Sequence, residues 1–211
     1  MPRHSSFVFL LVLALVARAE TLDRIAVTVG KYVISEQDLV RDIRVSAFLD
    51  GTAPGFDGTQ RRKAADRLID QYLVLQDATE THATLPPAGS ATPLLTPLKA
   101  RYASEAEYRA ALDKAGISDA GLQTHLLTGL RMLRYTNVRF RPQMQVSEEG
   151  LRAYFEALMS QNPNAPAQSF EESRGQVEKL LTDQQTMQSL DDWLKMMRGE
   201  TQILYREAVF R

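Results

Sequence analysis

The sequence predicts a mainly α-helical protein that carries one small antiparallel sheet. Two runs rich in β-branched residues, within residues 22–35, lie on either side of Gly30 and Lys31. About six stretches with apolar residues at helical spacing follow, and a short alternating segment around Ile203 ends the chain. Because an isolated hairpin is only marginally stable, we expect the C-terminal strand to pair with it and close the chain on itself.

The first nineteen residues are typical of a cleavable secretory signal peptide. Arg3 gives a positive start, residues 7–16 are an apolar run, and small residues at Ala17 and Ala19 form a cleavage motif. The apolar run is about half as long as the ~20 residues that a membrane span requires. We therefore expect cleavage after Ala19, a single module over residues 20–211, and a periplasmic location. Secretion to the exterior is the alternative.

Local signals place the hairpin turn and the first two helices. Gly30 stands at the first central position of a two-residue turn, which suits type II′. Ser35 is expected to cap the first helix, with Asp38 three residues on. Three glycines and a proline make residues 51–59 a mobile loop, and a long helix is expected over residues 60–81.

The later helices follow from capping residues and from the prolines and glycines that end them. Ser104 with Glu107, and Ser169 with Glu172, have the spacing of capping boxes. A linker is expected over residues 161–168. The expected helices cover residues 92–102, 104–116, 118–140, a shorter stretch from 147, and 169–199, after which the strand lies within 202–210.

Composition argues against several classes of protein. The formal net charge of the chain is −1, and loss of Arg3 and Arg18 with the signal peptide leaves 23 Lys+Arg against 26 Asp+Glu, or −3. A nucleic-acid binder would instead carry a basic excess. The absence of cysteine excludes disulfides, thiolate metal sites and a lipid anchor on cysteine. We expect neither a nucleic-acid partner nor a stable membrane anchor.

No catalytic, cofactor-binding or metal site is expected. His82 and His125 lack an acidic or histidine partner at the third or fourth following position, which a helix-borne metal site uses. The adjacent carboxylates at 171–172 and 191–192 point about 100° apart on a helix and do not converge on one substrate. The motifs of serine hydrolases, zinc proteases, P-loops and dinucleotide-binding folds do not occur.

Methionine and aromatic residues gather in the middle and late parts of the chain. Methionine adapts to many partners and is common on promiscuous binding surfaces. One interpretation is a cleft for unfolded polypeptide clients, and the other is ordinary core packing. The candidate client-binding residues are Met132, Tyr135, Phe140, Tyr154 and Phe155.

Two apolar strand segments lie on either side of the Gly30-Lys31 turn, and Ser35, Asp38 and Leu39 follow them. This pattern after a signal peptide resembles the N-terminal module of SurA-type periplasmic chaperones. The long helix that ends over residues 68–76, the helix pair at 104–140 and the tail at 169–205 also follow that family's order. The resemblance implies that the C-terminal helix and strand pack back on residues 20–160. The hairpin positions that carry it are Ile25, Val27, Val29, Val33, Ile34, Ser35, Asp38 and Leu39.

One departure from the family changes the expected function. Its members usually carry parvulin-type prolyl isomerase domains, each of roughly 90 residues, within the usual size range of a domain. The only gap here, residues 159–169, is far too short, so we expect no isomerase activity. The resemblance implies an ATP-independent holdase for unfolded or extended polypeptides, such as outer-membrane protein precursors. Alternatives are an adaptor with one fixed partner and a residual prolyl isomerase, and the oligomeric state is left open.

Overall fold

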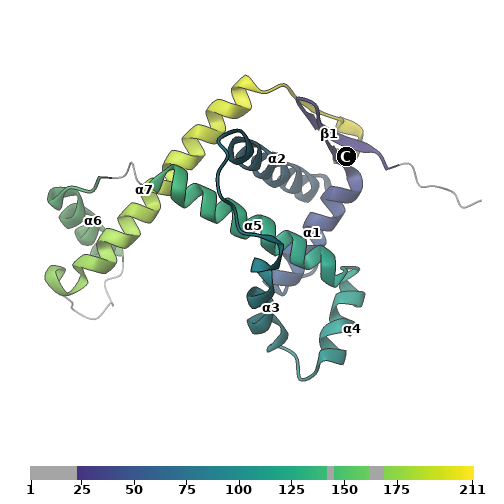
Figure 1. The fold of residues 1–211 in the computed structure, drawn as a ribbon, viewed down its shortest axis with the longest axis horizontal. Coiled ribbons are helices and arrows are strands. Elements are labelled where there is room, and N and C mark those ends of the chain that lie inside the picture. Colours follow the sequence, from purple (N-terminus) through teal and green to yellow (C-terminus); the bar gives the residue numbers. More distant parts are fainter. Residues whose placement is uncertain (1–22, 142–144, 162–168) are drawn as a thin grey trace, which may run out of the picture.

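The computed structural model describes residues 23–141, 145–161 and 169–211 and confirms a mainly α-helical fold with a small antiparallel sheet (Figure 1). The predicted signal peptide, residues 1–19, and residues 162–168 of the predicted linker lie outside this part. The described elements are β1 (Ile25–Val29), β2 (Tyr32–Ser35), α1 (Glu36–Asp50), α2 (Gly58–Glu80), η1 (Ala88–Ala91), α3 (Thr92–Lys99), α4 (Glu105–Ala115), α5 (Asp119–Arg139), α6 (Glu148–Gln161), α7 (Phe170–Glu200), β3 (Ile203–Tyr205) and η3 (Glu207–Phe210).

The sheet has the order β2-β1-β3, and both pairs of strands are antiparallel. The C-terminal strand therefore pairs with the N-terminal hairpin, as the sequence predicted. Gly30 has a φ of +58° and Lys31 does not have a positive φ, as a type II′ turn requires. The amide of Gly30 also donates to the carbonyl of Gln202 at 2.8 Å, so the turn itself is held by the segment that leads into β3.

The inner face of the sheet forms the centre of the larger core. Val27, Val29 and Ile34 are almost completely buried on this face, where helices cover them. Complete burial of one such side chain contributes about 1.5–3 kcal/mol. The helical side chains in this core come from α1, α2, α5 and the C-terminal half of α7, and they include Leu39, Ile43, Ala65, Ile69, Leu73, Tyr135, Phe140, Leu190 and Leu194.

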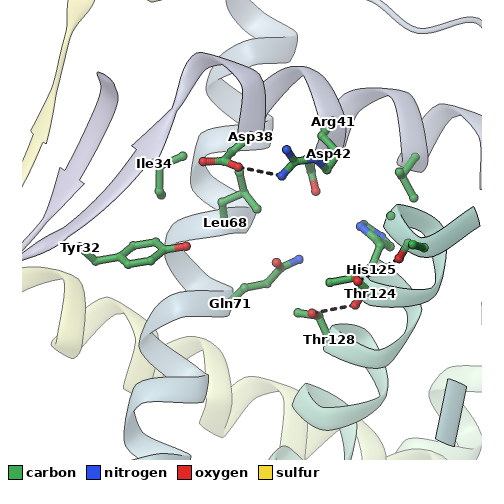
Figure 2. A pocket seen from close by; sticks show the side chains of 13 residues that line it. Tyr32, Ile34, Asp38, Arg41, Asp42, Leu68, Gln71, Thr124, His125 and Thr128 are labelled. Atoms are coloured by element: carbon green, nitrogen blue, oxygen red, sulfur yellow. Dashed lines mark hydrogen bonds and ion pairs between the residues drawn. The ribbon is translucent and has the colours of Figure 1, made fainter. Parts of the chain in front are cut away.

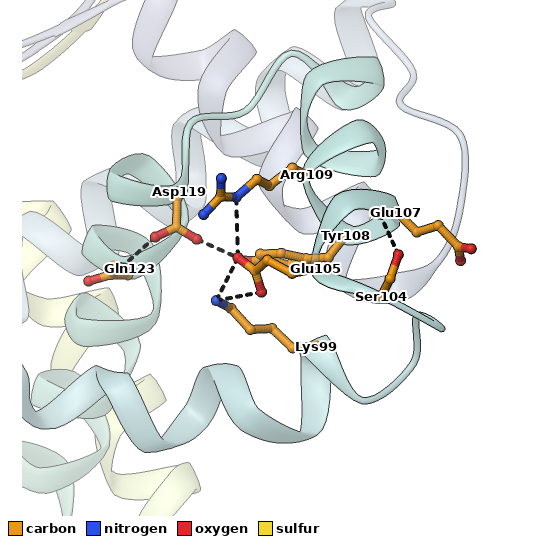
Figure 3. A network of polar contacts seen from close by, with 8 residues as sticks. All are labelled: Lys99, Ser104, Glu105, Glu107, Tyr108, Arg109, Asp119 and Gln123. Carbon is orange, nitrogen blue, oxygen red and sulfur yellow. Dashed lines mark hydrogen bonds and ion pairs between the residues drawn. The ribbon is translucent and has the colours of Figure 1, made fainter.

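A second, smaller core joins the end of α1 to α3, α4 and the start of α5. Its buried ring, Tyr108, donates from its hydroxyl to Asp119 at 3.0 Å (Figure 3). Burial, together with this hydrogen bond, raises the pKa of Tyr108 well above its usual value, so the hydroxyl keeps its proton. Around it, Glu105 binds Lys99 and Arg109 at the surface. This network fixes α4 between α3 and α5.

Most of the predicted caps are present, and three predicted details need correction. Ser35 and Ser169 form complete capping boxes. The carboxylate of Glu107 accepts from the amide of Ala103 rather than that of Ser104, so the third box is incomplete. Helix α2 begins two residues before the predicted start because Asp57 caps it. Helix α3 ends at Lys99 instead of 102.

Helix α6 and the N-terminal half of α7 project away from the sheet as an arm (Figure 1). Phe155 of α6 packs edge-on against Phe170 of α7, with ring centroids 5.6 Å apart. Two ion pairs between the helices, Glu148 with Arg174 and Arg152 with Glu171, add to this contact. Among the described helices, none is long and apolar enough to span a membrane.

Candidate functional site

Three of the five predicted client-binding residues lie in or against the larger core. Tyr135 and Phe140 are buried there, and Met132 packs against the same cluster. The Tyr135 hydroxyl donates to Asp77 at 2.5 Å, and the Phe140 ring lies 5.9 Å from that of Trp193. These side chains join α5 to α2 and α7, which is the ordinary core packing that the sequence left as an alternative.

The other two predicted residues, Tyr154 and Phe155, are half-buried on α6. Phe155 packs on Phe170, inside the arm. The structure therefore places the five residues in two parts of the molecule, the core beside α5 and the arm. Their role in binding clients stays a prediction.

The outer face of the sheet, which sequence reasoning did not single out, carries an exposed apolar row. Thr28 lies opposite Val33 of β2 and Leu204 of β3, so one row crosses all three strands. Val33 is 44% exposed, Leu204 47%, and Ile25 at the start of β1 43%. Period-2 alternation in the sequence could have found Val33 and Leu204. It would have placed Ile25 with Val27 and Val29, but a β-bulge between Ile25 and Val27 pairs Ile25 with Ser35, on the same face as Val33. We call Ile25, Thr28, Val33 and Leu204 the outer sheet face.

A pocket of about 370 Å³ lies between β2, α1, α2 and α5 (Figure 2). Ile34, Val45 and Leu68 form apolar parts of its wall. At one side the ring of Tyr32 stacks on Tyr72, with centroids 4.3 Å apart. The pocket therefore lies on the inner side of the sheet, away from the outer sheet face.

The most unusual group in this pocket is Asp42 of α1, which is 3% exposed. Arg67 of α2 donates to its Oδ2 atom from Nε at 3.0 Å and from Nη2. The Oδ1 atom is buried and has no hydrogen-bond partner in the described structure. Figure 2 shows the carboxyl pointing from α1 into the space beside Gln71 and His125. A buried carboxylate oxygen without a partner is rare in native proteins.

The other polar groups of the pocket set its charge. Burial lowers the pKa of His125, Asp42 opposes that shift and Arg67 reinforces it, so the neutral imidazole is favoured. Arg41 donates to Asp38 at 2.9 Å (Figure 2). Thr124, Thr128 and Gln71 add neutral polar groups. The pocket thus combines an apolar wall with one unsatisfied acceptor.

The pocket combines apolar side chains with the buried carboxylate of Asp42 and the imidazole of His125. Within residues 23–141, 145–161 and 169–211, no group of three or more acidic or histidine side chains is placed to hold a metal ion. No family model matches the chain, and no curated protein matches it either. The function is therefore inferred from the side chains and geometry described above.

Proposed function

We propose that the protein is an exported, ATP-independent holdase that binds unfolded or extended polypeptides. The observation that carries the proposal is the outer sheet face, on which Val33 and Leu204 flank Thr28 in one row across three strands and are each about half exposed. Contiguous exposed apolar side chains are typical of interaction surfaces. The N-terminal signal-peptide pattern supports export, and the resemblance to SurA-type chaperones supports the class of client.

The outer sheet face suits weak and reversible binding. Complete burial of a Val, Leu or Ile side chain contributes about 1.5–3 kcal/mol, so covering three half-exposed ones contributes about 1 kcal/mol each. A contact of this strength is weak on its own, so a client is held by this face together with other contacts and dissociates without an energy source. The proposed holdase therefore needs no nucleotide or cofactor.

The free edge of β2 offers a second contact to an extended client. Val29 and Tyr32 flank the two-residue turn and form the closing hydrogen-bonded pair. The next pair, Thr28 with Val33, is therefore a non-hydrogen-bonded one, and the amide and carbonyl of Val33 point away from β1. A client strand could add at this edge beside the exposed Val33 side chain. Because Ser35 already caps α1, the edge is short.

An aggregation assay with an unfolded outer-membrane protein tests the proposal. We expect the protein at several-fold excess to suppress light scattering. The double variant Val33→Thr and Leu204→Thr keeps residues that favour strands and should lose at least half of this suppression. Leu94→Gln on α3, where Leu94 is 41% exposed outside the sheet, is the matched control and should suppress normally. No suppression by the unaltered protein would refute the proposal.

An adaptor with one fixed partner is the second candidate, because a rigid preformed apolar face also suits a single folded protein. A pull-down from a periplasmic extract distinguishes the two. One folded partner in stoichiometric amount, lost in the same double variant, would favour the adaptor. Many unfolded precursors in small amounts would favour the holdase.

A further inference from the structure

We propose that the pocket between β2, α1, α2 and α5 binds one primary ammonium or guanidinium group carried on an apolar stem, with Asp42 as the acceptor. The source is either a lysine or arginine side chain of a polypeptide or a small free amine. This inference goes beyond the proposed holdase function and does not rest on it. The pocket is lined by Tyr32 and Ile34 and lies on the opposite side of the sheet from the outer sheet face.

The first argument is the unsatisfied Oδ1 atom of Asp42. A carboxylate is an acceptor with about four lone-pair sites, and Arg67 binds only its Oδ2 atom. Leaving the second oxygen buried without a donor is unfavourable, and a hydrogen bond from a charged donor is the strongest remedy. The missing group is therefore a donor, and an anion or a pure acceptor cannot supply it.

The second argument is charge. Two acidic side chains, Asp38 and Asp42, line the pocket against a single basic one, Arg41. Arg41 is already engaged with Asp38 at 2.9 Å, and the lining His125 favours its neutral form. Arg67 reaches Asp42 from outside the lining and occupies one oxygen only. With Arg67 counted, the two carboxylates and the two guanidinium groups balance, so no excess positive charge opposes a cation, and the unpaired Oδ1 atom selects a donor.

The third argument is the shape of the pocket. Its volume of about 370 Å³ holds one long side chain and no larger element of a protein. The apolar surfaces of Ile34, Val45 and Leu68 suit the methylene stem of a lysine-like group, which packs on apolar surface while its charged end bonds elsewhere. Entry to Oδ1 requires a side chain to turn aside. Arg41 lines the pocket, and its largely exposed side chain is free to change position.

Ligand titration of the full chain, followed by the ring signals of His125, tests the inference. The first probe is N-acetyl-lysine methylamide, which represents a polypeptide side chain. The matched norleucine compound has the same stem without the ammonium group, and cadaverine represents a free amine. We expect saturable shifts of the His125 signals with an ammonium-bearing probe and none with norleucine. A response to cadaverine alone would assign the site to free amines.

Two variants locate the binding in the pocket. Asp42→Asn should weaken binding at least tenfold, but it also removes the charge partner of Arg67. Thr124→Trp avoids this problem, because Thr124 is exposed at the mouth of the pocket and a bulky ring there blocks entry. Arg134→Trp, exposed elsewhere on α5, is the control and should bind normally. Equal binding of norleucine, or undiminished binding by Thr124→Trp, would overturn the inference.

The same variants separate this inference from the proposed function. Thr124→Trp should suppress aggregation as well as the unaltered protein does, because the outer sheet face is untouched. Conversely, Val33→Thr with Leu204→Thr should leave the response of His125 to the ammonium probe unchanged. Failure of the aggregation assay with normal amine binding would refute only the holdase.

Discussion

Gly58, the first residue of α2, lies against the C-terminal turn η3. A Cβ atom at this position would lie 2.0 Å from the carbonyl oxygen of Phe210, which is backbone and cannot turn aside. We expect Gly58→Ala to displace the C-terminal turn and to lower the free energy of unfolding by about 1–3 kcal/mol, as overpacking does. Urea denaturation measures the change.

The control for Gly58→Ala is Gly129→Ala in the middle of α5. No atom lies within 4 Å of a Cβ placed at Gly129, so the added methyl group meets open space. This variant should raise stability by up to about 1 kcal/mol, because alanine is the better helix former. Equal free energies of unfolding for Gly58→Ala and Gly129→Ala would contradict the close approach of α2 to the C-terminal turn.

At the residue scale, the sequence predicts which side chains are apolar but not which of them a neighbouring element covers. Tyr135 of α5 and Phe140, the residue that follows this helix, were predicted to contact clients. In the structure, side chains of α2 and α7 cover both of them. Asp42 is similarly unpredictable, because the arginine that binds it lies 25 residues away on another helix. A buried acidic residue on a helix that also carries Arg41 and Arg44 gives no local signal. The candidate pocket was therefore found only from the structure.

At the scale of elements, Arg198 fastens the end of α7 to α2. Its guanidinium donates to Asp70 Oδ1 at 2.7 Å and to the side chain and carbonyl of Asp66 at 3.1 and 2.9 Å. Tyr205 of β3 donates to the same Asp66 side chain at 2.9 Å. We expect Arg198→Met to lower the free energy of unfolding by about 1.5–3 kcal/mol, the range of hydrogen bonds to charged groups.

Lys195→Met, one turn earlier in α7, is the control for Arg198→Met. Lys195 is 73% exposed and pairs only with Asp192 on its own helix in the described contacts. Exposed pairs of this kind contribute little, so a change of no more than about 0.5 kcal/mol is expected. Thermal unfolding of the two variants side by side provides the comparison. Equal stabilities would show that Arg198 does not hold the two helices together.

The caps explain why most elements could be predicted and why some boundaries could not. Ser35, Ser118 and Ser169 begin α1, α5 and α7 through hydrogen bonds made within a few residues, so the sequence contains the whole signal. The end of α3 depends instead on tertiary contacts. Tyr102 leaves the helix and packs its ring near those of Phe48 and Tyr108, at 6.4 and 5.7 Å.

At the scale of the whole molecule, the closure of the sheet was predictable because two β-rich segments needed a third and only one was available. The arm was not predictable, since its direction depends on how the long helix α7 crosses α5 and not on any local pattern. The arm therefore projects from the rest of the molecule and is packed less densely than the region around the sheet (Figure 1). The sheet and α2 form a dense body, whereas Leu151 is the only fully buried side chain described for α6.

Because α6 buries fewer side chains than α2, we expect the arm to unfold locally before the sheet and α2 unfold. Local stability follows the number of buried apolar contacts, and α6 has few compared with α2, where Ile69 and Leu73 are buried in the core. Amides of α6 and of residues 170–184 should therefore exchange with solvent faster than those of α2. Trp193, the single tryptophan, lies in the C-terminal half of α7 against Phe140 and reports on the body.

On mild heating or in low urea, the far-ultraviolet circular dichroism should accordingly lose part of its helical signal before the fluorescence of Trp193 changes. Phe155→Ala, which removes the ring contact with Phe170 between α6 and α7, should widen the gap between the two transitions. Lys195→Met should leave the gap unchanged. Coincident transitions and uniform exchange would instead mean that the arm and body unfold as one unit. The arm would then be as firmly held as the sheet, despite its sparse packing.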